Sequence, residues 1–528
     1  MGRGKRYRTG RWAAALSIAL MGFSASGLAR SLTLNAVQTF GTIDPAKMTD
    51  YTQYLAVVNL YDDLVYASPS GKIIPHLASS WTVGDGGKAY TFKIRPGIRF
   101  HDGMPLTAAD VVYSMRRLLA IDQGPAFLWQ GVLKPSGVTQ VGSNQVRFTL
   151  IHPYSPFLAT LPLLFVLNEK QLVKHQKSGP YGKWGDYGQS WLLNHDAGSG
   201  PYTLRTFVDG SQVTFQRFAG YWMGWPKGAF NTVNVIFTNN DSTVLSLART
   251  GRLQLTSQFQ APETYKTLAS FPNWKVVKAP SNTIFYLKLN TQKPPTDSRR
   301  VRWAIAYAIH YATIQHSLYP GAAPRGLLAP PGSAFSNPNI PELHQDLAKA
   351  KAELAKSRYA GKKLHITLTY VAGTAFEQQV ALLLQSDLAK IGIQVSIVPA
   401  PWNRITQLAT SKSQTPNASE VFFGPTYPSP NSVFYTQYDS NAPHTWASMA
   451  WLHDPQVNRL IVQAQDASGF AQQKAIYDKL QAILFRLMPD VPLVVQTYEY
   501  GMLKSIHGYT YNPIQSFDMN FHNLYWAP

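Results

Sequence analysis

Short alternating runs and longer helical runs of apolar residues follow one another along most of this chain. An apolar residue at every second position is typical of a half-buried strand, and one at every third or fourth position is typical of an amphipathic helix. The alternating pattern predicts strands at 31–37, 90–95, 145–150, 202–207, 212–218, 283–290, 364–370 and 393–398. The helical pattern predicts helices at 54–64, 107–118, 297–309, 375–390 and 470–487. Interleaved strands and helices predict an α/β protein.

Turn and capping residues separate the first of these elements. Asp85-Gly86-Gly87 stands before the strand at 90–95, and residues of this kind tolerate the positive φ of a hairpin turn. Thr107 stands before the helix at 107–118, and Asp110 follows it by three residues, so the two predict a weak capping box.

A second group of elements predicts how one sheet is built. The strand at 364–370, the helix at 375–390 and the strand at 393–398 form a βαβ unit, and the helix should stop at Gly392. Consecutive strands joined by a helix run parallel. We therefore expect a partly parallel sheet with helices on its faces.

The length and composition limit the class of protein. At 528 residues the chain is too long for one hydrophobic core, so two or three lobes are expected. There is no cysteine, which excludes disulfides, thiolate metal ligands and a cysteine nucleophile. We also expect no lipid anchor of the bacterial lipoprotein type, because that anchor is attached to a cysteine.

Residues 1–29 have the pattern of a secretory signal peptide. Residues 12–23 are apolar but too few to span a bilayer, and Gly27 and Ala29 are small residues suited to cleavage before Arg30. A basic region precedes them: Arg3, Lys5, Arg6, Arg8 and Arg11. We expect an exported, soluble protein in the periplasm of a Gram-negative cell.

The chain is strongly basic. Its formal net charge is +20, and without the five charges of the signal peptide it would be +15. Such a charge either attracts an anionic ligand or surface, or reflects the compartment and is spread thinly. No dense run of Lys or Arg follows residue 29, which favours the second interpretation and argues against nucleic-acid binding.

No set of residues in the sequence forms a strong catalytic motif. There is no His-Glu-x-x-His, no phosphate-binding loop and no dinucleotide fingerprint in a βαβ unit. Residues 198–200 read Gly-Ser-Gly, but they lack the Gly-x-Ser-x-Gly spacing of a nucleophile elbow. His101-Asp102 could suggest metal ligands, and we interpret the two residues instead as a pair that stabilises a turn.

The segment from 78 to 117 closely resembles one family of proteins. Residues 90–97 read Tyr-Thr-Phe-Lys-Ile-Arg-Pro-Gly, residues 100–103 read Phe-His-Asp-Gly and residues 107–111 read Thr-Ala-Ala-Asp-Val. They resemble the family 5 extracellular solute-binding proteins, the peptide, nickel and opine receptors of bacterial ABC importers. Shorter resemblances to the same family occur at 43–45, 196–202 and 301–309.

This resemblance implies a type II periplasmic-binding-protein fold of the α/β class. The implied order is a signal peptide at 1–29; lobe I at 30–65, 195–282 and 495–528; an inserted subdomain of lobe I at 66–194; and lobe II at 283–494. The implied function is not enzymatic: the protein is the periplasmic substrate-binding component of an ABC importer. It captures a peptide or peptide-like solute between its lobes and delivers it to a permease in the inner membrane, as a monomer without a cofactor.

The ligand-binding residues that we expect lie between the lobes. Aromatic side chains there either contact the ligand or pack in the core. Arg404 either pairs with a carboxylate or phosphate of the ligand or remains in solvent. The expected residues are Phe40, Phe127, Trp129, Trp402, Arg404, Phe423, Gly424, Pro425, Thr426 and Ser429.

One departure from the family bears on the ligand. Residues 426–430 read Thr-Tyr-Pro-Ser-Pro, where peptide-binding members typically carry Asp-Tyr-Pro-Asp-Pro and an acid pairs with the peptide's α-ammonium. Thr426 and Ser429 are neutral, so this loop should not bind a free ammonium through a carboxylate. A non-peptide ligand (an opine, a sugar conjugate or a metal chelate) is therefore an alternative. A secreted hydrolase is an alternative from another class, and the missing catalytic residues argue against it.

Overall fold

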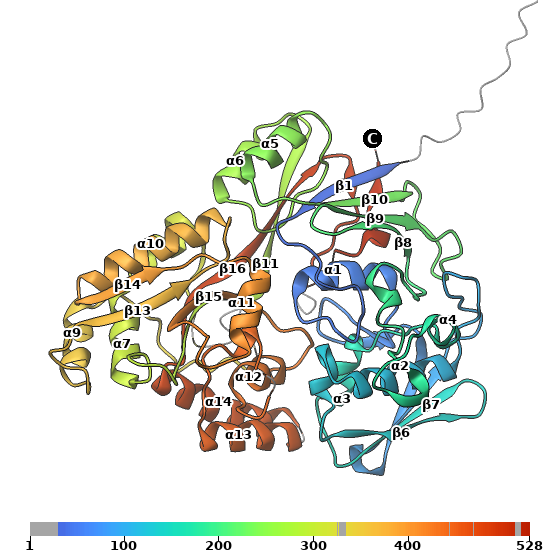
Figure 1. The fold of residues 1–528 in the computed structure, drawn as a ribbon, viewed down its shortest axis with the longest axis horizontal. Helices are drawn as coiled ribbons and strands as arrows, with labels where there is room; N and C mark the ends of the chain where they lie inside the picture. The colour runs from blue at the N-terminus through green and yellow to red at the C-terminus, as the bar shows by residue number, and fades with distance from the viewer. Residues whose placement is uncertain are drawn as a thin grey trace, which may run out of the picture.

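Two masses of chain stand side by side, joined by two long strands (Figure 1). The structure, a computed structural model, describes residues 30–527 apart from 325, 327–333, 443, 468 and 513–518. The expected signal peptide lies outside the described residues. Within the residues that are described, no helix is both long and apolar enough to cross a membrane.

The mass on the right of Figure 1 contains the residues expected for lobe I and its inserted subdomain. Its first sheet has the order β1 (Ser31–Ala36), β10 (Thr232–Phe237), β9 (Gln212–Arg217) and β8 (Tyr202–Val208). Its second sheet has the order β4 (Ala78–Gly84), β5 (Ala89–Ile94), β7 (Gln145–Leu150) and β6 (Leu133–Val141). The main helices are α1 (Tyr51–Leu60), α2 (Ala108–Ile121), α3 (Phe157–Thr160) and α4 (Glu169–His175). Helices α5 (Asp241–Arg249) and α6 (Pro262–Ala269) lie at the top of Figure 1, between the two masses. Short strand pairs are β2 (Val65–Ala67) with β3 (Ile73–Pro75), and β17 (Ile506–His507) with β18 (Tyr525–Trp526).

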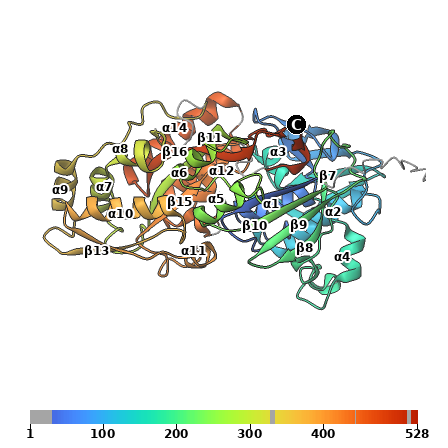
Figure 2. The same cartoon turned by 90° about the horizontal axis from the view of Figure 1, so that it is seen from above.

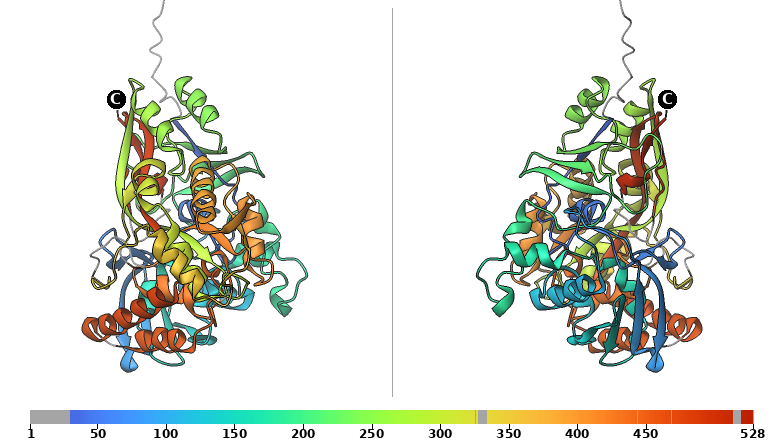
Figure 3. Two further views of the ribbon diagram at one scale, coloured as in Figure 1. Left: turned by 90° about the vertical axis from the view of Figure 1, so that its left-hand side faces the viewer. Right: turned by 90° about the vertical axis from the view of Figure 1, so that its right-hand side faces the viewer.

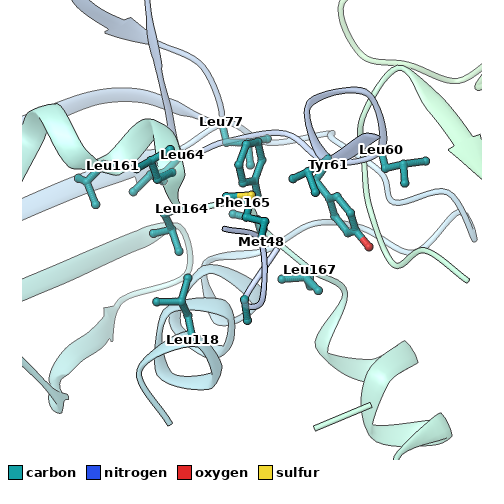
Figure 4. Packing of buried hydrophobic residues seen from close by; sticks show 14 of the residues in the cluster. Met48, Leu60, Tyr61, Leu64, Leu77, Leu118, Leu161, Leu164, Phe165 and Leu167 are labelled. Atoms are coloured by element: carbon teal, nitrogen blue, oxygen red, sulfur yellow. The ribbon is translucent and has the colours of Figure 1, made fainter. Parts of the chain in front are cut away.

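The core of this mass is continuous. Figure 4 shows apolar side chains around α1 and α2 that point toward one another. They come both from residues 30–65 and from residues 66–194, so the expected inserted subdomain shares one buried cluster with the rest of lobe I. The labelled members are Met48, Leu60, Tyr61, Leu64, Leu77, Leu118, Leu161, Leu164, Phe165 and Leu167.

The mass on the left, lobe II, is built on a six-stranded sheet. The order of its strands is β12 (Gly321–Ala322), β16 (Asp490–Leu503), β11 (Trp274–Leu289), β15 (Ala418–Phe423), β13 (Leu364–Thr369) and β14 (Ile393–Ile397). Strand β13 runs parallel to both β14 and β15, which confirms the parallel part predicted from the βαβ unit.

Helices cover both faces of the lobe II sheet (Figures 1 and 2). Alternate residues of β11 separate the two faces, because Phe285 and Leu287 pack in one buried cluster while Ile284 and Tyr286 pack in another. The first cluster includes residues of α7 (Arg299–Ala308), α9 (Leu347–Ala355) and α10 (Ala375–Ala389). The second includes residues of α11 (Trp402–Ala409), α12 (Asn431–Tyr438), α13 (Pro455–Asp466) and α14 (Phe470–Leu487). A single turn, α8 (Tyr311–Thr313), follows α7.

Strands β11 and β16 belong to both lobes. They pair antiparallel from Trp274 opposite Leu503 to Lys288 opposite Asp490, and they run together down one side of the molecule in the side views (Figure 3). The regular pairing is interrupted between Pro280 and Ile284, at the expected boundary between the two lobes. The sequence predicted only the second half of β11, because lysines and Pro280 disturb the alternation of the first half.

Most of the predicted elements are confirmed within one to three residues. Strand β7 and helix α14 have the predicted bounds, and Asp85 to Gly87 form the turn between β4 and β5 with positive φ. The capping box of α2 is confirmed, since Asp110 accepts hydrogen bonds from both the backbone N–H and the hydroxyl of Thr107 at 2.8 and 2.7 Å. Ser298 stands at the N-cap position of α7, but its side chain makes no capping hydrogen bond.

Candidate ligand-binding site

Two adjoining spaces lie between the lobes. The inner cavity has a volume of about 40 Å³ and the outer cleft a volume of about 870 Å³. They adjoin because the same residues line both: Val37, Gln38 and Asp50 from lobe I, and Val371 and Trp402 from lobe II. The outer cleft is within the size range of a small-molecule site, and the inner cavity extends it by only a few atoms.

Hydrogen bonds cross from one lobe to the other around these spaces. The indole N–H of Trp402 donates to Oδ2 of Asp50 at 3.2 Å, and that of Trp446 donates to the carbonyl of Thr49 at 2.9 Å. Phe259 of lobe I lies against Phe422 of lobe II, with ring centroids 5.8 Å apart. The lobes are therefore in contact over the inner cavity.

Asp50 contributes a carboxylate from lobe I. It is the N-cap of α1, and it accepts hydrogen bonds from the backbone N–H groups of Thr52 and Gln53. Burial raises the pKa of Asp50, and its hydrogen bonds, including the one from Trp402, oppose that rise. Asp50 therefore has partners on both sides of the interface.

Lobe II contributes two carboxyl groups, Glu377 from α10 and Glu420 from β15. Oε2 of Glu377 accepts a hydrogen bond from the N–H of Val371 at 2.7 Å, and burial raises its pKa to about 8. Neither carboxyl oxygen of Glu420 has a hydrogen-bond partner among the described residues. Burial and the nearby charge of Glu377 raise the pKa of Glu420 well above its usual value. Among the described residues that line the inner cavity there is no Lys, Arg or His.

Of the residues predicted from the sequence, Trp402 and Phe40 lie at these spaces. Half-buried Trp402 lines both of them, and its ring packs edge-on against Trp446. Phe40 lines the outer cleft, although it is only 1% exposed and packs edge-on against Phe237.

Phe127 and Trp129 lie elsewhere. Phe127 stacks on Tyr435 across the lobe interface and lines a separate cavity of about 460 Å³. Trp129 is fully buried, and its indole N–H donates to Oγ1 of Thr160 at 3.0 Å, which places it in the core of the expected inserted subdomain.

The remaining predicted residues do not line the inner cavity or the outer cleft. Phe423 is buried on the opposite face of β15 from Phe422, and Gly424 and Pro425 follow it. Thr426 and Ser429 lie in a tight turn, where Thr426 N–H donates to the hydroxyl of Ser432 and Asn431 N–H donates to that of Ser429. Arg404 is exposed on α11 and donates a hydrogen bond to Gln407 at 3.4 Å.

Sequence reasoning missed the three acidic residues of the inner cavity. One signal was available for Glu420, because a single acid stands in the buried strand Ala-Ser-Glu-Val-Phe-Phe of residues 418–423. A charged residue in such a strand needs a partner or a function. Asp50 and Glu377 resemble ordinary helix-cap and first-turn acids in sequence, so their position at the cavity required the structure.

Polar residues in two other segments that resemble the family form contacts within the protein, away from the two spaces. Asp44, in the resembling segment at 43–45, forms a buried two-point ion pair with Arg117 at 2.6 and 2.7 Å. His101 contacts Asp196 and the carbonyl of Gly200, so it joins the two segments with the densest resemblance, 95 residues apart. In the described part of the chain, no group of three or more potential ligands is placed to hold a metal ion.

Comparison with known proteins gives a consistent picture. The model of the bacterial extracellular solute-binding proteins, family 5 Middle, matches residues 72–444. The glutathione-binding protein GsiB of Escherichia coli is 27% identical over 97% of this chain and 98% of its own length. The dipeptide-binding protein of Escherichia coli is 26% identical over 94% of this chain and 95% of its own length. The structure of a dipeptide-binding protein from Pseudoalteromonas in complex with Met-Leu covers 94% of this chain and 100% of its own, with a TM-score of 0.84 and 23% identity.

Proposed function

This chain belongs to family 5 of the bacterial extracellular solute-binding proteins, and on that premise we propose that it is the receptor of an ABC importer for peptides or peptide-like solutes. Its fold is the α/β fold of the periplasmic binding proteins, as the sequence predicted. The ligand is captured between lobes I and II and passed unchanged to a permease, so the protein is a receptor and not an enzyme.

The observation that supports this function best is the pair of spaces between the lobes. Hydrogen bonds from Trp402 to Asp50 and from Trp446 to Thr49 connect the two walls, so a solute in the outer cleft would be held by both lobes. A solute that contacts both lobes favours their closed arrangement, because it binds that arrangement more tightly than the open one.

We also propose a division of the chain into lobes, which the pairing of β11 with β16 supports. We assign 30–65, 195–282 and 495–528 to lobe I, 66–194 to its inserted subdomain and 283–494 to lobe II. The interruption of the β11–β16 pairing between Pro280 and Ile284 supports a hinge at the boundary between residues 282 and 283. Here Oγ of Ser281 donates to the carbonyl of Gln496 at 2.6 Å, and Oγ1 of Thr283 hydrogen-bonds the hydroxyl of Tyr498 at 2.9 Å.

The cellular place of the receptor is part of the proposal. Relatives of this family work outside the cytoplasm, and residues 1–29 have the pattern of a cleaved signal peptide. We propose export to the periplasm without a lipid anchor, followed by action as a monomer.

Scattering and calorimetry test this function together. We expect alanyl-alanine, methionyl-leucine or glutathione to bind, and the bound protein to have a smaller radius of gyration in solution than the free protein. Binding of none of these peptides, or binding without any change in radius, would contradict capture by closure.

A matched pair of variants tests the contact between the lobes. Trp402→Phe keeps an aromatic ring but removes the N–H that reaches Asp50 across the interface. One hydrogen bond of this kind changes affinity by about three- to tenfold, so the variant should bind the peptide more weakly by that factor. Trp303→Phe is the control, because the indole of Trp303 donates to the carbonyl of Arg486 within lobe II.

A further inference from the structure

Glu420 has a position that folding alone does not explain. It lies in β15, directly opposite Leu287 of β11, and its side chain is on the same face of the sheet as Phe422. It is 1% exposed, and neither of its carboxyl oxygens has a hydrogen-bond partner among the described residues. An isolated buried carboxyl group is costly, since it loses its hydration and gains nothing in return.

A second acidic side chain, Glu377, makes the position of Glu420 less favourable still. Glu377 at the start of α10 lines the same cavity and is 4% exposed, with one backbone N–H as its hydrogen-bond partner. The ring of Phe376 packs edge-on against Phe422, which holds this end of α10 on β15. Two acidic side chains therefore share one largely apolar space.

The inner cavity has the size and charge for one kind of chemical group. Its volume of about 40 Å³ corresponds to roughly three water-sized groups. Asp50 lines its other wall, and the residues around it include no basic side chain. A small group with several N–H donors and a positive charge would satisfy the free oxygens of Glu420. The outer cleft would hold the rest of the molecule.

The charged residues that line the inner cavity are acidic, whereas the protein as a whole is basic. The protein has a formal net charge of +20, with 28 acidic against 48 basic residues. A random selection of its charged residues would line a cavity mainly with lysine and arginine. Three acids and no base instead line this one, which favours a cationic group as the occupant.

We propose that the inner cavity is a cation subsite, in which Glu420 and Glu377 bind an ammonium or guanidinium group of the captured solute. This inference rests on the proposed function and specifies the solute's chemistry. The carboxylates that bind the cation belong to β15 and α10, whereas the loop at 426–429 presents only hydroxyls. Asp50 stays with Trp402 and Thr52 and adds negative charge from lobe I, so that a bound cation draws both lobes together.

Binding of a cation here should release protons. Without one, the buried acids are held largely in the neutral form, and a positive charge within hydrogen-bond distance favours their ionised form. The other titratable groups around these two acids include Asp50 on the opposite wall, the phenol of Tyr370, which interacts with both acids, and the phenol of Tyr319, which interacts with Glu377. A phenol is neutral near pH 7, and burial raises the pKa of both further, so the released protons come from the carboxyl groups.

Three peptides test the proposal by calorimetry. Alanyl-alanine carries a free α-ammonium, N-acetyl-alanyl-alanine carries no cation, and N-acetyl-alanyl-lysine carries a cation only on its side chain. We expect at least one of the two cationic peptides to bind about 10- to 100-fold more tightly than N-acetyl-alanyl-alanine. The tighter of the two identifies whether the cation comes from the peptide terminus or from a side chain. Titration in buffers of different ionisation enthalpy should show release of about one proton per bound cation.

Variants test whether the preference for a cationic peptide and the proton release depend on the acids of the inner cavity. Glu420→Gln keeps the size of the side chain and removes its charge, so the preference for the cationic peptide and the proton release should both be lost. Glu377→Gln is the second variant and should reduce both. Glu353→Gln is the matched control, because Glu353 on α9 pairs with Arg300 on α7 and does not line the cavity.

The outcomes separate this proposal from the function on which it rests. The proposal is overturned if N-acetyl-alanyl-alanine binds wild-type protein as tightly as the cationic peptides, or if Glu420→Gln keeps the full preference. In either case the peptide receptor function stands. If none of the three peptides binds the wild-type protein but methionyl-leucine does, methionyl-leucine and its N-acetyl form decide the proposal in their place. If neither these peptides nor glutathione bind, peptide capture itself fails and the cation subsite fails with it.

Discussion

The buried carboxyl group of Glu377 makes the stability of the protein depend on pH. Burial raises its pKa from 4.5 to about 8 in the folded protein. Below about pH 4.5 the carboxyl group is neutral in both states, so its ionisation does not change the free energy of unfolding. Above that pH the unfolded chain loses the proton and the folded protein keeps it, so the free energy of unfolding falls as the pH rises toward 8.

Glu377→Gln should therefore stabilise the protein at alkaline pH. The shift corresponds to about 5 kcal/mol at most, so the variant's advantage in free energy of unfolding should grow by several kcal/mol between about pH 5 and pH 8. Urea unfolding of both proteins at several pH values measures it. Glu353→Gln, at a half-exposed ion pair, controls for the amide substitution itself. An advantage that is equal at both ends of the range would contradict the buried, protonated state of Glu377.

Single residues also show which parts of the site the sequence could not reveal. Trp402 was predicted from the cleft that the family resemblance implies, and it lies at both spaces. Trp129 was predicted on the same grounds and is fully buried. Glu420 was missed because its importance depends on which face of β15 meets lobe I. That relation is set by the pairing of β15 with β11 and β13, and no local pattern contains it.

At the scale of elements, the end of α1 depends on a turn far away in the sequence. The turn at residues 198–200 crosses the last carbonyl of α1, and Gly200 N–H donates to the carbonyl of Leu60 at 3.0 Å. A side-chain carbon added at Gly198 would lie 1.8 Å from that carbonyl oxygen, which is far inside van der Waals contact. Glycine is thus required here for the close approach of two backbones.

Gly198→Ala should destabilise the protein on the order of 3 kcal/mol, because either the turn or the end of α1 has to move. Denaturant unfolding measures the change. Gly84→Ala is the matched control, since no atom lies within 4 Å of the added carbon and its φ of −133° suits any residue. We expect the control to stay within about 0.5 kcal/mol of wild type. Equal stability of the two variants would show that the turn adapts without cost.

The elements themselves were the most predictable level of the structure. Helices α10 and α14 and strands β7 and β14 follow from local apolar patterns because each buries one face and exposes the other. The first half of β11 escaped the pattern, since it crosses between lobes and has no single buried face. The order of the lobes came only from the resemblance to a family, because no local interaction specifies which segments meet.

At the scale of the whole molecule, the sequence predicts that the functional protein is shorter than the chain. The basic and apolar pattern of residues 1–29 predicts removal by a signal peptidase before Arg30. Intact-mass measurement of the protein recovered from periplasm should show a species that lacks about 29 residues and carries no lipid. Substitution of Ala29 by a bulky residue should block cleavage. Recovery of the uncleaved chain from membranes in the wild type would contradict export as a soluble receptor.

The path of the chain through the lobes has a consequence for the timing of folding. Met519, Phe521 and Leu524 are buried in the same cluster as Leu32 and Leu34, so lobe I is completed by segments from opposite ends of the described chain. Lobe II draws its buried clusters from residues between 284 and 495. Because a chain emerges from the ribosome or a translocation channel from its N-terminal side, lobe II can pack before lobe I is closed. The larger core should thus form last, and the receptor should gain its cleft only when residues 519–524 arrive.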